Sequence, residues 1–178
     1  NLVTPTHYVH QIVRALPSAI EKGLTIPLVY NSGGYDSPEV LRFLDGIFDI
    51  YMPDIKFLDT ALAARYCHAE DYPSVVWKAV KEMHRQVGDL VVDERGIARR
   101  GLIIRHLVMP GAAADTRKVL ERIGAELSPD SYVNIMAQYY PCHRASEFPE
   151  ISRRISMEEF EDAVRYGRSI GLTRASRH

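Results

Sequence analysis

The sequence predicts an α/β fold built on one mostly parallel sheet of about five strands, with helices on the outer face of that sheet. Five times, a short apolar run rich in β-branched residues stops in a polar cluster, and a helix-like segment follows. These runs span residues 1–3, 26–30, 47–52, 101–108 and 132–137. Continuous apolar runs are typical of buried parallel strands. Because such strands end at a common edge, we expect the polar clusters to share one site.

Composition predicts one cytoplasmic domain over residues 1–178. The chain is 46% hydrophobic and 25% charged, with a net charge of −1, which is ordinary for a domain with a sizeable core. A near-neutral chain is a poor ligand for a polyanion, so we expect no nucleic acid partner. No apolar stretch reaches the ~20 residues of a membrane span, so we expect no membrane association. Cys67 and Cys142 lie far apart in sequence, which favours two free thiols.

The first helices are indicated by apolar periodicity and by end signals. Residues 8–22 carry a helical apolar stripe, and Pro17 inside it predicts a kink or a short break. Ser37 and Pro38 are expected to begin a short helix that ends near Gly46. Asp59 is expected to cap a helix that runs to His68.

The remaining elements alternate in the same way. Residues 71–86 predict a long helix, and residues 90–94 and 97–99 predict a small hairpin that leads into the fourth strand. A helix over residues 112–123 follows. Ser156 and Glu159 form a capping box for the last helix, which ends near Gly171. The tail, residues 173–178, is expected to be loose.

Asp54 and Lys56 follow the third strand and flank Ile55. In extended geometry both side chains therefore point to the same face. A carboxylate there can accept both hydroxyls of a ribose, and an ammonium can bind a ligand carboxylate. A structural ion pair at a loop explains the same pattern, and the sequence leaves both interpretations open.

Arg105 lies inside an otherwise apolar strand, although a guanidinium is rarely buried without an anionic partner. Its position indicates either a ligand at the mouth of the sheet or a local acidic residue that pairs with Arg105 for structure. His106, its neighbour, should point the opposite way and is interpreted as structural.

The other polar ends give weaker signals. The backbone amides of residues 31–34 and the side chains of Asn31 and Ser32 can hold an anion or an amino acid head group, and a plain turn fits equally well. His143 follows the fifth strand, where a side chain can fold over a ligand, and His7 holds the matching place after the first.

Four motifs resemble those of a known family. They are NLVTPTH at residues 1–7, VYNSGGY at 29–35, DIYMPDIK at 49–56 and GLIIRHLVMPG at 101–111. In this order they resemble the PflX-type branch of the radical S-adenosylmethionine proteins, which are relatives of the pyruvate formate-lyase activating enzymes. The likeness spans essentially the whole chain.

The resemblance implies a partial TIM-type (β/α)6 barrel, S-adenosylmethionine as the radical source and a [4Fe-4S] cluster on a Cys-x3-Cys-x2-Cys loop after the first strand. It also implies that this chain begins inside the second strand, which leaves about five units. A cubane cluster normally needs three thiolates at one site, which Cys67 and Cys142 cannot supply. We therefore expect the [4Fe-4S] cluster only in a longer parent protein, and no turnover by this chain alone.

The resemblance also implies roles for single residues. Asp54 and Lys56 match positions that contact the ribose and the methionyl carboxylate of S-adenosylmethionine, and Arg105 matches an arginine near the substrate. The residues expected at the cofactor are His7, Asn31, Ser32, Asp54, Lys56 and His143. Two departures concern recognition of the methionyl amine. Residues 5–7 read Pro-Thr-His where the wider family has Gly-Gly-Glu, and Asn31 replaces an aspartate.

Three functional hypotheses follow. The first is a radical S-adenosylmethionine enzyme whose parent makes a 5′-deoxyadenosyl radical for hydrogen abstraction, with a glycyl-radical enzyme or another protein or peptide as partner. The second is a metal-dependent barrel hydrolase or lyase in which His7, Asp54, His106 and His143 converge on a divalent ion. The third is a non-catalytic binding domain that docks through residues 139–154.

Overall fold

The computed structural model describes residues 1–177 and the side chains of residues 1–175. Its sheet has the strand order β1-β2-β3-β5-β6-β7, and every neighbouring pair along this path is parallel. The strands are β1 (Leu2–Val3), β2 (Val29–Ser32), β3 (Ile50–Pro53), β5 (Ala98–Leu107), β6 (Tyr132–Met136) and β7 (Ser176–Arg177). The sheet is open, with β1 and β7 at opposite edges in the described part of the chain. The predicted α/β fold with a mostly parallel sheet is confirmed.

Several strand boundaries differ from the sequence prediction. β2 and β3 each begin three residues later than expected, and β5 begins three residues earlier. β2 continues through Asn31 and Ser32, because it pairs with β3 as far as Pro53. The tail was expected to be loose, but Ser176–Arg177 form β7 along the outer edge of β6, where unpaired backbone groups are available. The predicted hairpin is confirmed by β4 (Val91–Val92), which pairs antiparallel with the start of β5.

The helices follow the predicted caps closely. They are α1 (Val9–Glu21), α2 (Pro38–Phe43), α3 (Thr60–Cys67), α4 (Tyr72–Val87), α5 (Ala113–Glu126) and α6 (Met157–Ser169), with short 3-10 turns η1 (Pro5–Tyr8), η2 (His143–Glu147) and η3 (Pro149–Ile151). Asp59 accepts hydrogen bonds from the amides of Ala61 and Leu62. The capping box of Ser156 and Glu159 is present. Pro17 lies inside α1 without breaking it.

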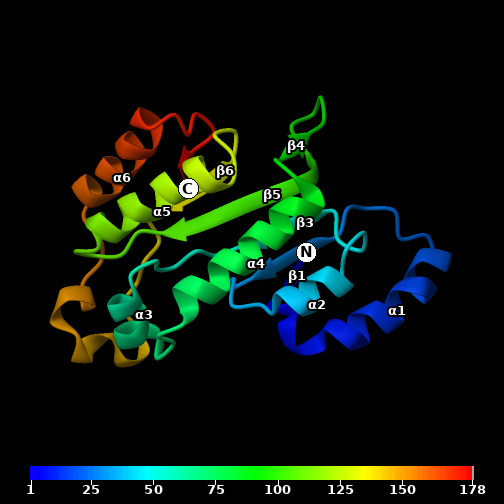
Figure 1. The fold of residues 1–178 in the computed structure, drawn as a ribbon, viewed down its shortest axis with the longest axis horizontal. Helices are drawn as coiled ribbons and strands as arrows, with labels where there is room; N and C mark the ends of the chain where they lie inside the picture. The colour runs from blue at the N-terminus through cyan, green and yellow to red at the C-terminus, as the bar shows by residue number, and fades with distance from the viewer. Residues whose placement is uncertain (178) are drawn as a thin grey trace.

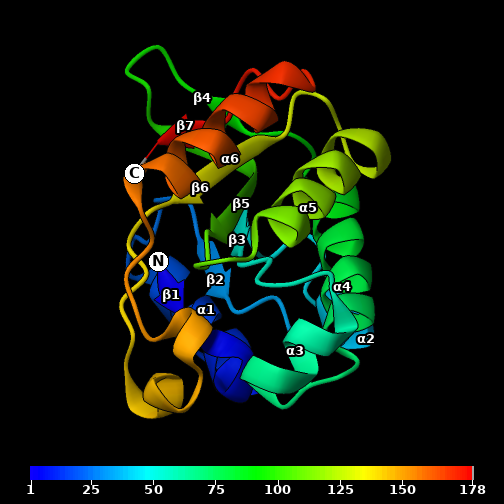
Figure 2. The same ribbon diagram turned by 90° about the vertical axis from the view of Figure 1, so that its left-hand side faces the viewer.

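The two faces of the sheet differ in their surroundings. On one face, side chains such as Tyr51, Ile104 and Ile135 are fully buried. Figure 2 shows α4 and α5 on one side of the sheet and the connection from β6 to α6 running down the other. We call the second side the open face; it carries Asn31, Met52, Asp54, Ile103, Arg105, Leu107 and Asn134. All of these except Asn31 are only partly buried.

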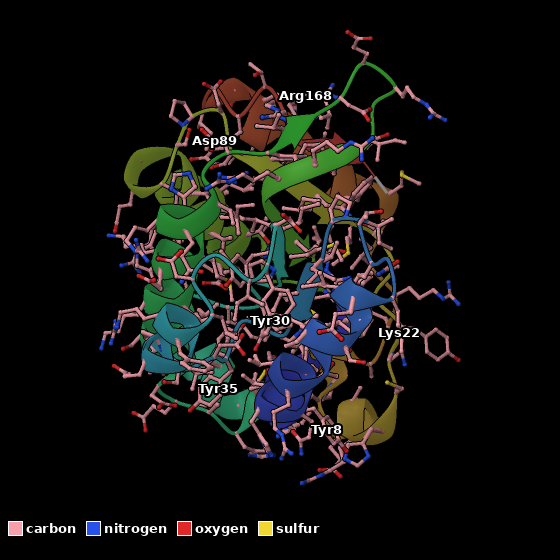
Figure 3. All side chains as sticks on the ribbon, turned by 90° about the vertical axis from the view of Figure 1, so that its right-hand side faces the viewer. Tyr8, Lys22, Tyr30, Tyr35, Asp89 and Arg168 are labelled. Carbon is pink, nitrogen blue, oxygen red and sulfur yellow. The ribbon has the colours of Figure 1, made fainter. Side chains whose placement is uncertain are left out.

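An aromatic cluster packs β2 against β3 and the loop before β3. Tyr30 contacts Phe48 edge-on, with ring centroids 5.0 Å apart, and Tyr51 at 5.6 Å. Figure 1 shows α4 crossing in front of the sheet, and Figure 3 shows Tyr30 in the interior, with Tyr8 and Lys22 at the periphery. In the described part of the chain, no helix is long and apolar enough to cross a membrane.

Candidate functional site

The exits of β3 and β5 form a small charged cluster on the open face. Asp54 and Arg105 are bridge partners across these strands, so their side chains leave the sheet side by side. Arg105 Nε donates to Asp54 Oδ1 at 2.8 Å, and Arg105 Nη2 lies 2.6 Å from the same oxygen. Lys56 Nζ donates to Asp54 Oδ2 at 2.6 Å. One carboxylate is thus shared by two cations, and the cluster has a net charge of +1.

Both structural ion pairs considered from the sequence therefore exist. The cluster can still bind a ligand, because the Lys56 side chain is 41% exposed and its ammonium is accessible. The Asp54 side chain is 16% exposed. Ile55 between them is fully buried, which directs both charged neighbours to the open face. The arrangement presents an ammonium to solvent over a fixed carboxylate.

Tyr72, at the start of α4, ties the turns after β2 and β3 together. Its hydroxyl accepts from the Lys56 amide at 3.0 Å and lies within donating distance of the carbonyl oxygens of Gly33, at 3.0 Å, and Asp54, at 3.1 Å. Burial raises the pKa of Tyr72, so the hydroxyl stays protonated. The Tyr35 ring stacks on it, with centroids 6.0 Å apart. Tyr72 was not identified from the sequence, because its role depends on contacts between distant turns.

Gly34 allows the turn after β2 to approach the exit of β3 closely. Its φ is +78°, and a Cβ built there would lie 2.3 Å from the Asp54 carbonyl oxygen and 2.7 Å from Val76 Cγ2. The Gly34 amide already donates to Ser32 Oγ at 3.2 Å. The glycine is therefore explained by packing on Asp54. Of the two interpretations that the sequence left open for this turn, this packing favours the plain turn over amides that hold a ligand.

Asn31 and Ser32 point to opposite faces, because both belong to β2 and side chains alternate along a strand. Ser32 Oγ donates to Asp36 Oδ2 at 2.6 Å on the helix-covered side, where Tyr30 and Thr6 donate to Asp36 Oδ1. Asn31 lies on the open face with Asp54. It is 6% exposed, and its side chain makes no hydrogen bond to another described residue. The structure thus brings Asn31, but not Ser32, to the side of the charged cluster.

His106 points away from the cluster, as expected. Its Nδ1 lies 2.8 Å from the Ile55 carbonyl oxygen, and its Nε2 lies 3.0 Å from Thr116 Oγ1. Burial lowers the pKa of His106, so the ring is neutral, with Nδ1–H donating and Nε2 accepting. His7 lies elsewhere too, at a surface hollow beside His10 and Phe43. The four residues proposed for a metal-dependent hydrolase therefore do not converge.

A cavity of about 310 Å³ opens beside Lys56, between α3 and the connection from β6 to α6. His143, which the sequence placed after the fifth strand, lines this cavity together with Lys56. The lining contains no aspartate or glutamate, and its aromatic side chains are Phe57, Tyr66, Tyr139, Tyr140 and Phe148. Cavities of ~300 Å³ or more hold drug-sized ligands. The polar lining groups are the ammonium of Lys56, the guanidinium of Arg144, and imidazole, thiol and hydroxyl groups, which favours an aromatic ligand that also carries an anionic group.

The walls of this cavity are held by contacts between distant segments. The rings of Tyr66 and Phe148 meet edge-on, with centroids 5.3 Å apart, and Tyr66 donates to Glu150 Oε1 at 2.7 Å. Burial raises the pKa of Tyr66 to about 12. Cys67 and Cys142 are free, as predicted. Both are exposed and line the cavity. Tyr139, Tyr140 and Phe148 lie in residues 139–154, the segment that the third hypothesis named as a docking surface. The sequence analysis identified no role for Phe57 or Tyr66.

Comparison with known proteins finds a similar protein, whose name states no activity. The chain is similar to an uncharacterized protein of Methanocaldococcus jannaschii, with 33% identity over 169 residues. The match covers 94% of this chain and 45% of the relative, so the chain spans about half the length of the curated relative it matches. No family model matches the chain, and no solved structure matches it.

Proposed function

We propose that this chain is the cofactor-binding part of a radical S-adenosylmethionine enzyme, and that its open sheet is a partial (β/α)6 barrel. The observation that supports this most directly is the placement of Asp54, Lys56 and His143. The first two form an ion pair at the strand exits, and the last two line one aromatic cavity. S-adenosylmethionine joins a zwitterionic methionyl group to a nucleoside. It therefore needs a charged site for the first and an aromatic cavity for the second, next to each other.

In this proposal each residue binds a different part of S-adenosylmethionine. Lys56 binds the methionyl carboxylate, because its ammonium is the exposed cation of the cluster. Asp54 stays oriented by Arg105 and accepts hydrogen bonds from the ribose hydroxyls. His143 and the aromatic walls of the cavity enclose the adenine. Asn31, unpaired among the described residues and on the same face as Asp54, is available to the methionyl group.

Ser32 and His7 do not contact the cofactor in this proposal. Ser32 holds Asp36 and accepts from the Gly34 amide, so it supports the turn that packs on Asp54. His7 follows β1 but neither lines the cavity nor contacts the charged cluster. It lies at the surface hollow beside His10 and Phe43, at the periphery of the proposed cofactor site.

The iron–sulfur cluster has no ligand set in these 178 residues, whose two cysteines lie on the cavity wall. We propose that a longer protein supplies it. When bound, the reduced cluster would provide the electron that cleaves S-adenosylmethionine into methionine and a 5′-deoxyadenosyl radical. The residues described here bind and orient the cofactor and exclude water from the nucleoside. A glycyl-radical enzyme or another protein or peptide is the proposed partner.

Calorimetric titration of the longer protein with S-adenosylmethionine tests the binding part of the proposal. Lys56→Gln should weaken binding about tenfold, which corresponds to 1.4 kcal/mol. Lys22→Gln, at the exposed end of α1, is the matched control and should bind like the unaltered protein. Equal affinities for the two variants would show that Lys56 does not bind the methionyl carboxylate.

A further inference from the structure

We propose that Asn134 is a recognition residue for an amide group of the substrate, and that it acts beside Arg105. The inference rests on the proposed function, which places the cofactor at Asp54, Lys56 and the cavity. Asn134 lies in the middle of β6, between the buried residues Val133 and Ile135. It was not identified from the sequence, although a polar residue inside an apolar strand is the same signal that identified Arg105.

The sheet register places Asn134 directly beside Arg105. The two are Cα partners across β5 and β6, and Arg105 is in turn the bridge partner of Asp54. Side chains at partner positions of parallel strands leave the same face of the sheet. Asp54, Arg105 and Asn134 therefore form one polar row across three strands of the open face.

Asn134 is incompletely paired in this row. Its Oδ1 is enclosed and has no hydrogen-bond partner among the residues whose side chains are described. A buried acceptor without a donor costs free energy, and a ligand donor would recover it. A rotation that turns Oδ1 outward would break no hydrogen bond to a residue whose side chain is described, because Oδ1 makes none with these residues.

Arg105 supplies the complementary donors. Asp54 engages its Nε and Nη2, and no contact with the described residues engages Nη1. The neighbouring groups thus offer guanidinium donors and a carboxamide that both donates and accepts. An amide group matches this set, because its carbonyl accepts from Arg105 or Asn134 Nδ2 and its N–H donates to Asn134 Oδ1.

The position suits a substrate next to the proposed cofactor. Leu107 lies two residues beyond Arg105 on the same face of β5, and it lines the cavity. The amide subsite is therefore one pleat, roughly 7 Å, along the strand from the cavity wall. A substrate held there has its amide beside the nucleoside and away from the Lys56 ammonium.

Nuclear magnetic resonance titration of the ¹⁵N-labelled chain tests the inference. The probe is N-methylacetamide, and its control is methyl acetate, which keeps the carbonyl and lacks the N–H donor. We expect N-methylacetamide to shift the side-chain signals of Asn134 and Arg105 saturably, and methyl acetate to bind at least about fivefold more weakly. Equal response to both probes, or shifts confined to other residues, would overturn the inference.

Variants separate the subsite from the cofactor site. Asn134→Leu should lose the N-methylacetamide response at Arg105, and Asn134→Ser, which shortens the side chain, should weaken it at least about fivefold. Gln138→Leu, which removes an exposed carboxamide beyond the end of β6, is the matched control and should keep the full response. An unchanged response in both Asn134 variants would overturn the inference. S-adenosylmethionine binding by the longer protein without any amide response would contradict only this subsite, whereas an amide response without cofactor binding would contradict only the proposed function.

Discussion

Asp54 and Arg105, 51 residues apart in sequence, meet at the exits of adjacent strands, where Arg105 Nε donates to Asp54 Oδ1 at 2.8 Å. The bridge between the two backbones fixes this meeting before any ligand arrives. A guanidinium held by a carboxylate loses little freedom when it binds a further group, so the pair is pre-organised for recognition.

The first prediction concerns this carboxylate. Asp54→Asn keeps the shape but removes the charge between Arg105 and Lys56, so it should destabilise the fold by about 1–3 kcal/mol. Urea denaturation measures the change. Asp130→Asn, at an exposed position with the same loss of charge, should have little effect. Equal midpoints for the two variants would show that the Asp54 ion pairs contribute no stability.

The second prediction concerns the turn after β2. Gly34→Ala places a Cβ 2.3 Å from the Asp54 carbonyl oxygen at a φ of +78°, and it should cost several kcal/mol. Gly33→Ala is the matched control, because a Cβ there meets nothing within 4 Å. Thermal or urea unfolding of both variants tests the difference. A Gly34→Ala protein as stable as the Gly33→Ala protein would contradict the close approach of the two turns.

The third prediction concerns Tyr72. Tyr72→Phe leaves the Lys56 amide and the neighbouring carbonyls without their shared hydroxyl, and it should cost roughly 1–3 kcal/mol. Tyr35→Phe removes an exposed hydroxyl bonded to Asp71 and should change stability by no more than about 0.5 kcal/mol. The free energies of unfolding of the two variants decide the point. If they matched, Tyr72 would not tie the turns together.

The fourth prediction concerns pH. Burial lowers the pKa of His106 in the folded state, so the unfolded chain takes up the proton first as the pH falls. The contribution of the neutral ring is complete above the unfolded pKa of about 6.5 and is lost progressively below it. His106→Asn cannot titrate. Between pH 7 and pH 5 the wild type should therefore lose more stability than the variant, and parallel pH profiles would contradict the assignment.

The sequence predicts the elements whose signals are local. Asp59 and the pair Ser156 and Glu159 define helix starts through hydrogen bonds that span two or three residues, and all are present. β7 could not be predicted in the same way. Two residues carry no periodicity, and this strand forms because the edge of β6 is available to it.

The candidate site was predictable to the extent that its residues end strands. Asp54, Lys56 and Arg105 meet as the parallel topology requires, and His143 joins Lys56 at the cavity. The sequence did not show that Asn31 and Ser32 lie on opposite faces of the sheet. That follows only once β2 is known to continue through both residues, because side chains alternate between the two faces within a strand. The aromatic wall depends on α3 meeting the connection from β6 to α6, a tertiary contact that no local pattern encodes.

The most direct test of the proposed function is product analysis on the longer protein that contains this chain. After anaerobic reconstitution with iron, sulfide and a reductant, it should convert S-adenosylmethionine to 5′-deoxyadenosine and methionine. Asp54→Ala should weaken cofactor binding about tenfold or more, because Asp54 is the proposed acceptor for the ribose hydroxyls. A protein that holds a full cluster yet forms no 5′-deoxyadenosine with any reductant would contradict the radical S-adenosylmethionine assignment.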